Sequence, residues 1–382
     1  MASDDSACAL EARAQVSHHA REAGQARPAR ERAMRWRMKM ALLSALAMGG
    51  ALHAQSRTPP VATYPKLAEF PKENRALAAE YMARARTVAG DDLFGDFVHR
   101  CITDPRFRQR VNALQMNALL PPAKVFDQLY FVGQNAESAW ALDTAEGIVL
   151  FDALENEEQA REIILPGLKA VGLDPTRLRY IVITHAHGDH YGGAEFLRKT
   201  YSAALISSAP DWAAMDAMRA RGRAEGPEGA PMPPARIEGK DRTIADGEAL
   251  KLGATTLHFY VTPGHTPGTV STIFDVTDHG KRHVAAFFGG FGAPRDPMQR
   301  YPHIASMRRF ADLAARAGAD VMLANHPVQD GAFEKLELLN YRHAGDANPF
   351  VVGPDKLARY YKVQETCSQL GLVRAGLDPE QP

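Results

Sequence analysis

The sequence predicts an α/β fold from two kinds of segment that alternate along the chain. Short apolar runs rich in β-branched residues, such as 147–151 and 180–183, have the composition of buried strands. Longer stretches with apolar side chains on one helical face, such as 157–171, are typical of amphipathic helices. With 45% hydrophobic residues, the 382-residue chain can bury the core of one large domain or two small ones.

Residues 34–54 have the pattern of a secretory signal peptide. Three basic side chains, Arg35, Arg37 and Lys39, precede an apolar run of small residues and leucines. Because the run is too short to span a bilayer comfortably, we expect cleavage and a periplasmic or secreted protein without a stable membrane anchor. Residues 1–33 are charged and lack apolar periodicity, which indicates either a disordered segment or a start codon placed too far upstream.

Export would change the net charge and the chemistry of the cysteines. Removal of residues 1–54 takes away eight basic and five acidic side chains, so the net charge becomes about −3 and does not favour nucleic acid as a partner. We expect a small-molecule substrate, and the sequence leaves the oligomeric state open. Cys101 and Cys367 remain as one pair in an oxidising compartment, which predicts a disulfide, with two free buried thiols as the alternative.

The segment 55–123 is expected to form a helical extension in front of a catalytic domain at 124–382. Residues 71–90 have the alanine, leucine and arginine content of a helix and end in a glycine. The catalytic domain ends with a predicted C-terminal helix. It begins with three short strands separated by turn residues: 129–132, 138–144 and 147–151.

Four side chains of metal-binding type follow the predicted strand at 180–183 within six residues: His185, His187, Asp189 and His190. Imidazole and carboxylate groups suit zinc, and four of them exceed what one tetrahedral ion takes from a single loop. The cluster therefore predicts a two-metal site. One alternative is a set of surface histidines, and another is a closed structural zinc site, which would favour cysteine ligands that this segment lacks.

The H-x-H-x-D-H spacing of these residues resembles the signature of the metallo-β-lactamase superfamily. The resemblance implies an αββα four-layer sandwich that holds one or two metal ions at the edge of two facing sheets. It implies that Asp152, at the end of the third predicted strand, hydrogen-bonds the ligand loop. It also implies that His265, in a glycine- and proline-rich loop at a strand end, is the third metal-binding histidine.

Within the superfamily, the chain is most similar to the third subclass of zinc β-lactamases. Glyoxalase II, the RNase Z-like nucleases and many lactonases place a metal-bridging aspartate in a loop that corresponds to 284–295, and this segment contains no aspartate. The third subclass dispenses with that aspartate and uses a last histidine for its second metal. His326, at the end of a predicted strand and followed by a proline, resembles this last histidine.

The resemblance assigns six ligands to two zinc ions per chain. The first ion takes His185, His187 and His265, and the second takes Asp189, His190 and His326. Two such ions, about 3.5–4 Å apart, would share a hydroxide nucleophile, because coordination lowers the pKa of bound water to about 7. Asp189 would also orient this hydroxide. The predicted reaction is hydrolysis of the cyclic amide of a β-lactam, an activity that confers antibiotic resistance.

Two glycines depart from the pattern of the third subclass. Its members usually have serines where this chain has Gly290 and Gly292, and the serine hydroxyls help to hold the carboxylate of the β-lactam. Glycines leave room at this substrate loop, which could fit another substrate. The alternatives are a metallohydrolase acting on a lactone, an ester or another small amide, and a non-catalytic metal-binding protein that lacks an open cleft.

Overall fold

The computed structural model describes residues 70–102, 119–222 and 231–381, all within one compact unit, Ala62–Pro382. The predicted signal peptide at 34–54 and the preceding segment 1–33 lie outside the described residues, as does part of the predicted extension. Among the helices that are described, none combines the length and the apolar composition needed to cross a membrane.

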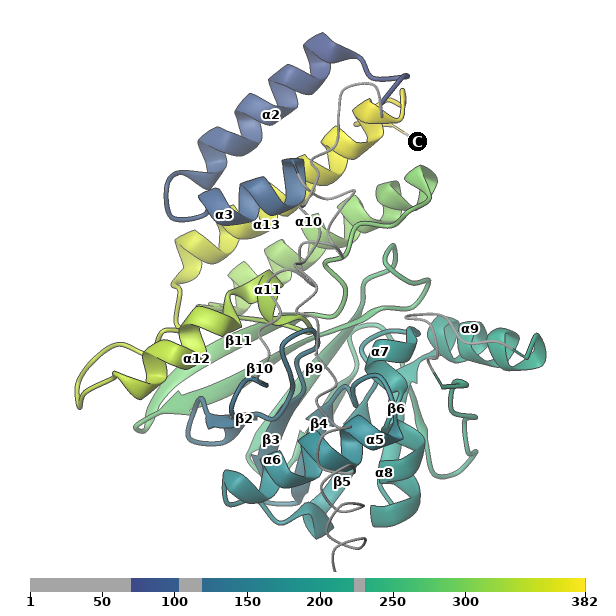
Figure 1. Ribbon diagram of the computed structural model, residues 1–382, viewed down its shortest axis with the longest axis vertical. Coiled ribbons are helices and arrows are strands. Elements are labelled where there is room, and N and C mark those ends of the chain that lie inside the picture. The colour runs from purple at the N-terminus through teal and green to yellow at the C-terminus, as the bar shows by residue number, and fades with distance from the viewer. Residues whose placement is uncertain (1–69, 103–118, 223–230, 382) are drawn as a thin grey trace, which may run out of the picture. The chain divides into compact units, whose positions relative to one another are not determined.

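Two β-sheets form the centre of the fold (Figure 1). The first sheet has seven strands in chain order: β1 (Ala123–Lys124), β2 (Leu129–Phe131), β3 (Trp140–Thr144), β4 (Gly147–Phe151), β5 (Leu178–Val182), β6 (Ala204–Ser208) and β7 (Arg242–Ile244). The second sheet has five strands in the order β12 (Val321–Ala324), β11 (Lys281–Phe288), β10 (Val270–Asp278), β9 (Thr255–Val261) and β8 (Ala249–Leu252).

The first sheet changes from antiparallel to parallel pairing at β4. Strands β1 to β4 pair antiparallel, whereas β4 to β7 pair parallel, with short helices in the connections. A parallel strand covered on both faces reads as a continuous apolar run, and β4, with the sequence GIVLF, is buried at every position. Strand β5 is parallel to β4, so both deliver their carboxyl ends to the same edge of the sheet.

The two sheets pack face to face through an apolar core that is rich in aromatic rings. Phe151 of the first sheet lies between Phe274 and Phe287 of the second, with ring centroids 5.5 and 5.3 Å apart. Trp140 contacts Phe131 and Phe350 edge-on, and its indole nitrogen donates a hydrogen bond to a backbone carbonyl of β12. Burial of these rings fixes how the two sheets face each other.

Helices cover the outer face of each sheet, so the αββα sandwich expected from the resemblance is confirmed (Figure 1). Those against the first sheet are α5 (Glu157–Gln159), α6 (Leu165–Ala170), α8 (Ala194–Tyr201) and α9 (Ala209–Ala220), with the π-helical turn η4 (Ala160–Ile164) joining the first two. Those over the second sheet are α10 (Arg300–Ala317) and α13 (Pro354–Arg374). The remaining helical segments of the sandwich are α7 (Gly188–Tyr191), α11 (Pro327–Asp330), α12 (Ala332–Asn340), η5 (Pro175–Arg177) and η6 (Pro297–Gln299).

The helical N-terminal part is present and packs on the C-terminal helix. It consists of α2 (Arg75–Ala89), α3 (Phe94–Phe97) and η2 (Val98–Ile102). Asn74 caps α2 by accepting a hydrogen bond from Leu77 N, and α2 lies along α13 (Figure 1). The disulfide predicted between Cys101 and Cys367 is present and joins η2 to α13.

Candidate metal centre

The ligand loop begins where β5 ends at the carboxyl edge of the first sheet. Asp152, which follows β4, is fully buried, and its carboxylate accepts hydrogen bonds from Thr184 N and Thr184 Oγ1, both 2.8 Å away. It also accepts one from His190 Nδ1 at 2.7 Å. Asp152 has a φ of 62°, a left-handed backbone conformation that aspartate adopts more readily than most residues. Asp152 therefore anchors both ends of the loop that carries the histidines.

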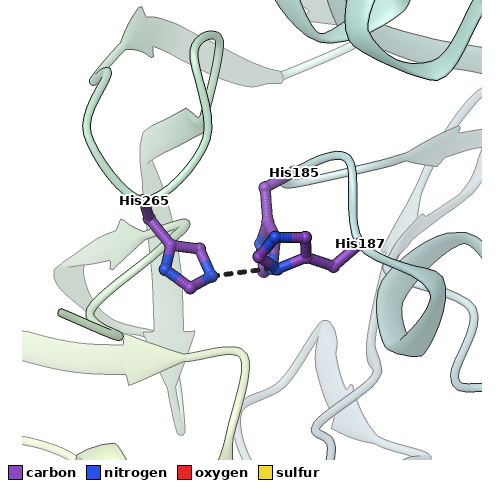
Figure 2. A group of neighbouring side chains, drawn as sticks. All are labelled: His185, His187 and His265. Carbon is purple, nitrogen blue, oxygen red and sulfur yellow. Dashed lines mark hydrogen bonds between the residues drawn. The ribbon is translucent and has the colours of Figure 1, made fainter. Parts of the chain in front are cut away.

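Three histidines from two different sheets meet at this loop. His185 and His187 follow β5 of the first sheet, and His265 lies in the turn between β9 and β10 of the second (Figure 2). One ring nitrogen from each lies within 4.8 Å of the others. His185 is buried, whereas His187 and His265 are partly exposed, so this first cluster is not fully enclosed.

The ring nitrogens of the first cluster are arranged to bind a cation. His185 Nδ1 lies 2.9 Å from the Gly289 carbonyl oxygen, and His265 Nδ1 lies 2.7 Å from the Gly292 carbonyl oxygen. A carbonyl can only accept, so each Nδ1 holds the proton and each Nε2 keeps its lone pair. The two Nε2 atoms face each other at 3.1 Å. Two lone pairs at that distance repel unless a cation lies between or beside them.

The cation between the His185 and His265 rings is not expected to be a proton. Burial and the neighbouring His190 and His265 hold the pKa of His185 well below its usual range. Burial together with His187 and His303 likewise keeps the pKa of His265 low. Both rings are therefore neutral near pH 7, which is the form that binds a metal ion.

The second cluster consists of Asp189, His190 and His326, whose ligand atoms also lie within 4.8 Å of one another. His326 follows β12, and its Nδ1 donates to the Ala136 carbonyl oxygen at 2.7 Å, which leaves Nε2 as the ligand atom. His190 donates through Nδ1 to Asp152, and its buried Nε2 has no hydrogen-bond partner in the described part of the chain. That atom lies 3.6 Å from Asp189 Oδ2.

The electrostatics of the second cluster favour positive charge. Burial opposes a charged His190, but Asp152 and Asp189 outweigh it and raise the pKa of His190 to about 10. Burial also opposes ionisation of Asp189, yet the nearby His190 and His326 hold its pKa well below the usual value. Two buried carboxylates beside His190 thus attract a cation, and a metal ion would displace the His190 proton.

Both clusters fit divalent metal ions of the zinc type. Their donors are imidazole nitrogens and one carboxylate. Four of the histidines form a hydrogen bond through Nδ1 and so offer Nε2 to their cluster: His185, His190, His265 and His326. The two clusters share the loop 185–190 and so lie next to each other, as His185 and His190 rings 4.0 Å apart show. The structure thus brings together all six residues that the resemblance grouped as metal ligands.

The loop with Gly290 and Gly292 contradicts the expectation that glycines leave room for a substrate. A Cβ on Gly290 would lie 2.8 Å from His265 Cβ, and one on Gly292 would lie 2.8 Å from His265 Cε1. The space is therefore filled by the His265 ring. The carbonyl oxygens of Gly290 and Gly292 accept hydrogen bonds from His303 and His265, at 2.9 and 2.7 Å. The glycines are needed so that this loop can approach the histidine closely.

Three further buried polar residues lie at the centre, and none of them is among the predicted site residues. Asn325 donates to the Gly289 carbonyl oxygen at 2.7 Å, His303 supports the Gly290 carbonyl oxygen, and Asp211 accepts hydrogen bonds from both histidine loops. Asn325 precedes His326 directly, and this adjacency was the one available signal. Asp211 has the sequence context of an ordinary first-turn acid of a helix, so its role depends on tertiary contacts.

Comparison with known sequences gives a family match in the centre of the chain. A model of the metallo-beta-lactamase superfamily matches residues 132–278. A probable metallo-hydrolase of Bacillus subtilis is 30% identical over 164 residues, which cover 42% of this chain and 71% of that protein. A hydroxyacylglutathione hydrolase of Acidiphilium cryptum is 28% identical over 107 residues, 28% of this chain and 35% of that protein. The chain thus spans about a third of the hydroxyacylglutathione hydrolases that it matches.

Comparison with solved structures covers more of the chain. A subclass B3 metallo-beta-lactamase of Bradyrhizobium japonicum superposes with a TM-score of 0.55 at 25% identity, covering 65% of this chain and 92% of that chain. A metallo-beta-lactamase of Cronobacter sakazakii gives a TM-score of 0.55 at 28% identity, covering 70% of this chain and 99% of that chain.

Proposed function

The chain belongs to the metallo-beta-lactamase superfamily, and from this membership and the two ligand clusters we propose that it is a two-zinc hydrolase that opens the amide of a β-lactam ring. The observation that carries the proposal is the pair of adjacent clusters, His185, His187 and His265 beside Asp189, His190 and His326. Similarity to solved subclass B3 metallo-beta-lactamases supports the choice of substrate.

The residues of the chain divide the work between holding the metals and orienting the reactants. Zinc ions bound in the two clusters supply a Lewis acid and a water of lowered pKa. Asp152 and the carbonyl oxygens of Gly289 and Gly292 fix the rings of His190, His185 and His265 in the orientation that directs Nε2 to the ions. Asp189 would hold the second ion and would also orient the water that this ion supplies.

Export to the periplasm or beyond the cell is part of the proposal. Residues 34–54 supply the signal peptide, and 124–382 form the catalytic domain behind the helical extension. The disulfide between Cys101 and Cys367 supports export, because disulfides persist in oxidising compartments and are rare in the cytosol.

An ester or lactone is the second candidate substrate, and the glycine loop favours it. Gly290 and Gly292 offer no hydroxyl, and their carbonyl oxygens already accept hydrogen bonds from His303 and His265. The loop therefore lacks the serine hydroxyls that help to hold the carboxylate of a β-lactam. Hydroxyacylglutathione hydrolases among the relatives are in keeping with an acyl substrate of another type.

A hydrolysis screen of the purified protein decides between these functions. Penicillins, cephalosporins including nitrocefin, and carbapenems form one arm, and lactones and esters form the other. Turnover of a β-lactam that EDTA abolishes and zinc restores supports the first proposal. Turnover of lactones or esters alone supports the second, and zinc-loaded protein that is inert in both arms points to a non-catalytic metal-binding protein.

A further inference from the structure

Asp211 is a fully buried carboxylate in the first turn of α9, behind the metal centre. A carboxylate is rarely buried unless its oxygens are well hydrogen-bonded, because loss of hydration is unfavourable. Asp211 is not one of the six predicted metal ligands. Its hydrogen-bond partners therefore indicate what it does.

Those partners lie on both histidine loops of the first cluster. Asp211 Oδ2 accepts from Ala186 N at 3.0 Å, and Ala186 lies between His185 and His187. The same oxygen accepts from Thr266 Oγ1 at 2.7 Å, and Thr266 follows His265 directly. One carboxylate oxygen thus joins the two loops that carry the three histidines.

The loop after His265 is held against α9 at a second point. Asp211 Oδ1 accepts from Gly268 N at 2.7 Å, and Ser208 Oγ donates to the Gly268 carbonyl oxygen at 2.5 Å. A Cβ on Gly268 would lie 2.5 Å from Asp211 N, so only glycine allows this close approach. The loop is docked on the helix through its backbone.

The link matters because the first cluster is built from two sheets. His185 and His187 follow β5 of the first sheet, whereas His265 follows β9 of the second. Their relative position depends on contacts that cross between the sheets. Asp152 accepts hydrogen bonds from Thr184 and His190 on the first sheet, and no identified hydrogen bond of Asp152 reaches the His265 loop.

We propose that Asp211 is the positioning residue of the first metal cluster. By holding Ala186 and Thr266 on one oxygen, it fixes the distance between the His185–His187 loop and His265, and so sets the metal affinity of that cluster. It acts through the loops and touches neither metal nor substrate. The inference rests on the proposed function in one respect, that the cluster binds a metal ion.

Competition with a chromophoric chelator measures the number and affinity of zinc sites in the whole protein without any substrate. Asp211→Asn keeps the volume of the side chain but places an amide group against backbone donors. We expect it to lower the affinity of one zinc site by about ten- to a hundredfold, the range for residues that hold metal ligands in place. The other site should keep its wild-type affinity. Wild-type affinity at both sites would overturn the proposal.

Asp241→Asn is the matched control. Asp241 is also buried, and it accepts hydrogen bonds from Leu205 N, Ile237 N and Arg198 at 2.9, 2.7 and 2.6 Å, but none from a ligand loop. We expect this variant to lose thermal stability while both zinc affinities stay unchanged. An equal loss of zinc affinity in Asp241→Asn and Asp211→Asn would show that Asp211 has only a general structural role.

Single-cluster backgrounds show which site responds. In His326→Ala, which lacks a ligand of the second cluster, adding Asp211→Asn should weaken the remaining zinc site. In His265→Ala, which lacks a ligand of the first cluster, adding Asp211→Asn should change nothing further. Equal weakening in both backgrounds would contradict a role confined to the first cluster.

A second contact between the sheets should allow the Asp211→Asn variant to fold. The backbone hydrogen bond from Val270 N to the Thr184 carbonyl oxygen, 2.7 Å, joins the two sheets independently of Asp211 and supports folding of the variant. If Asp211→Asn still does not fold, Thr266→Val removes the hydroxyl link and should give the same selective loss of zinc affinity.

Wild-type protein that binds no zinc overturns this inference and the proposed function together. Wild-type protein that binds two zinc ions but does not hydrolyse β-lactams overturns only the proposed substrate.

Discussion

His185 Nε2 and His265 Nε2 face each other at 3.1 Å, while the Nδ1 atom of each ring is hydrogen-bonded to a backbone carbonyl. Neither ring is readily protonated, because burial and neighbouring histidines keep both pKa values low. The pair therefore presents two lone pairs to the same small volume. A metal ion relieves this repulsion.

Replacing His265 should remove the first metal site. We expect His265→Ala to lower the zinc affinity of one site more than a hundredfold, since even residues that only orient ligands change affinity ten- to a hundredfold. Hydrolysis should be lost with it. Zinc content by competition titration checks the result, and His258→Ala, an exposed histidine of the preceding strand β9, serves as the control. Wild-type zinc binding and turnover in His265→Ala would contradict the ligand assignment.

Serine substitutions in the glycine loop should weaken zinc binding and should not improve β-lactam binding. In Gly290→Ser and Gly292→Ser the new Cβ meets the His265 side chain at 2.8 Å, so the ring must shift from its metal-binding position. Zinc titration and the KM for a penicillin check this expectation. Gly95→Ser, whose Cβ meets nothing within 4 Å, is the control. A lower KM together with unchanged zinc affinity would show that the loop can accept hydroxyls.

Loss of the disulfide should lower stability and leave the metal centre intact. Cys101→Ser combined with Cys367→Ser opens a bridge with a sequence separation of 266 residues, and bridges of this kind contribute about 2–5 kcal/mol to the free energy of unfolding. The bridge joins η2 to α13, and neither element carries one of the six metal-binding residues. Thermal unfolding should shift to lower temperature while the zinc content stays at two. A proportional loss of zinc would mean that the helical extension also shapes the metal centre.

The buried Asp330 should make stability fall as pH rises toward neutrality. Its carboxylate accepts hydrogen bonds from Ala324 N and Ala332 N, and burial raises its pKa to about 7 against the opposing charge of Lys335. The unfolded chain releases the same proton near pH 4. Between these values the folded state binds more protons, so the free energy of unfolding decreases with pH by up to about 1.4 kcal/mol per unit.

Asp330→Asn should remove this contribution. Thermal unfolding of EDTA-treated protein from pH 4.5 to 8 measures the stability of wild type relative to the variant. We expect this difference to fall with rising pH and to level off as the pH passes the pKa of about 7. Asp278→Asn offers a contrast, because the hydrogen bonds of Arg342 lower the pKa of Asp278. Its stabilising contribution is therefore complete at neutral pH and is lost only in acid. A difference that stays constant with pH would contradict the raised pKa of Asp330.

The sequence was sufficient for the features that depend on local order. Strand β4 and the helical run from Glu157 to Ala170 follow from apolar periodicity, since burial of one face or of a whole strand leaves a regular pattern. The spacing from His185 to His190 places four donors on one loop, because consecutive residues after a strand cannot lie far apart. The family resemblance added His265, His326 and the four-layer sandwich.

Tertiary structure alone decided how these donors meet. His265 reaches His185 because the two sheets pack through Phe151, Phe274 and Phe287. Local sequence patterns do not show which strands of the two sheets face each other. Gly290 and Gly292 accommodate the His265 ring, and Asp211 joins both histidine loops. Neither role can be predicted from local sequence, because a side chain's partners depend on which distant segments fold against it. Sequence thus determined which residues could bind metal, and packing between the sheets determined their geometry.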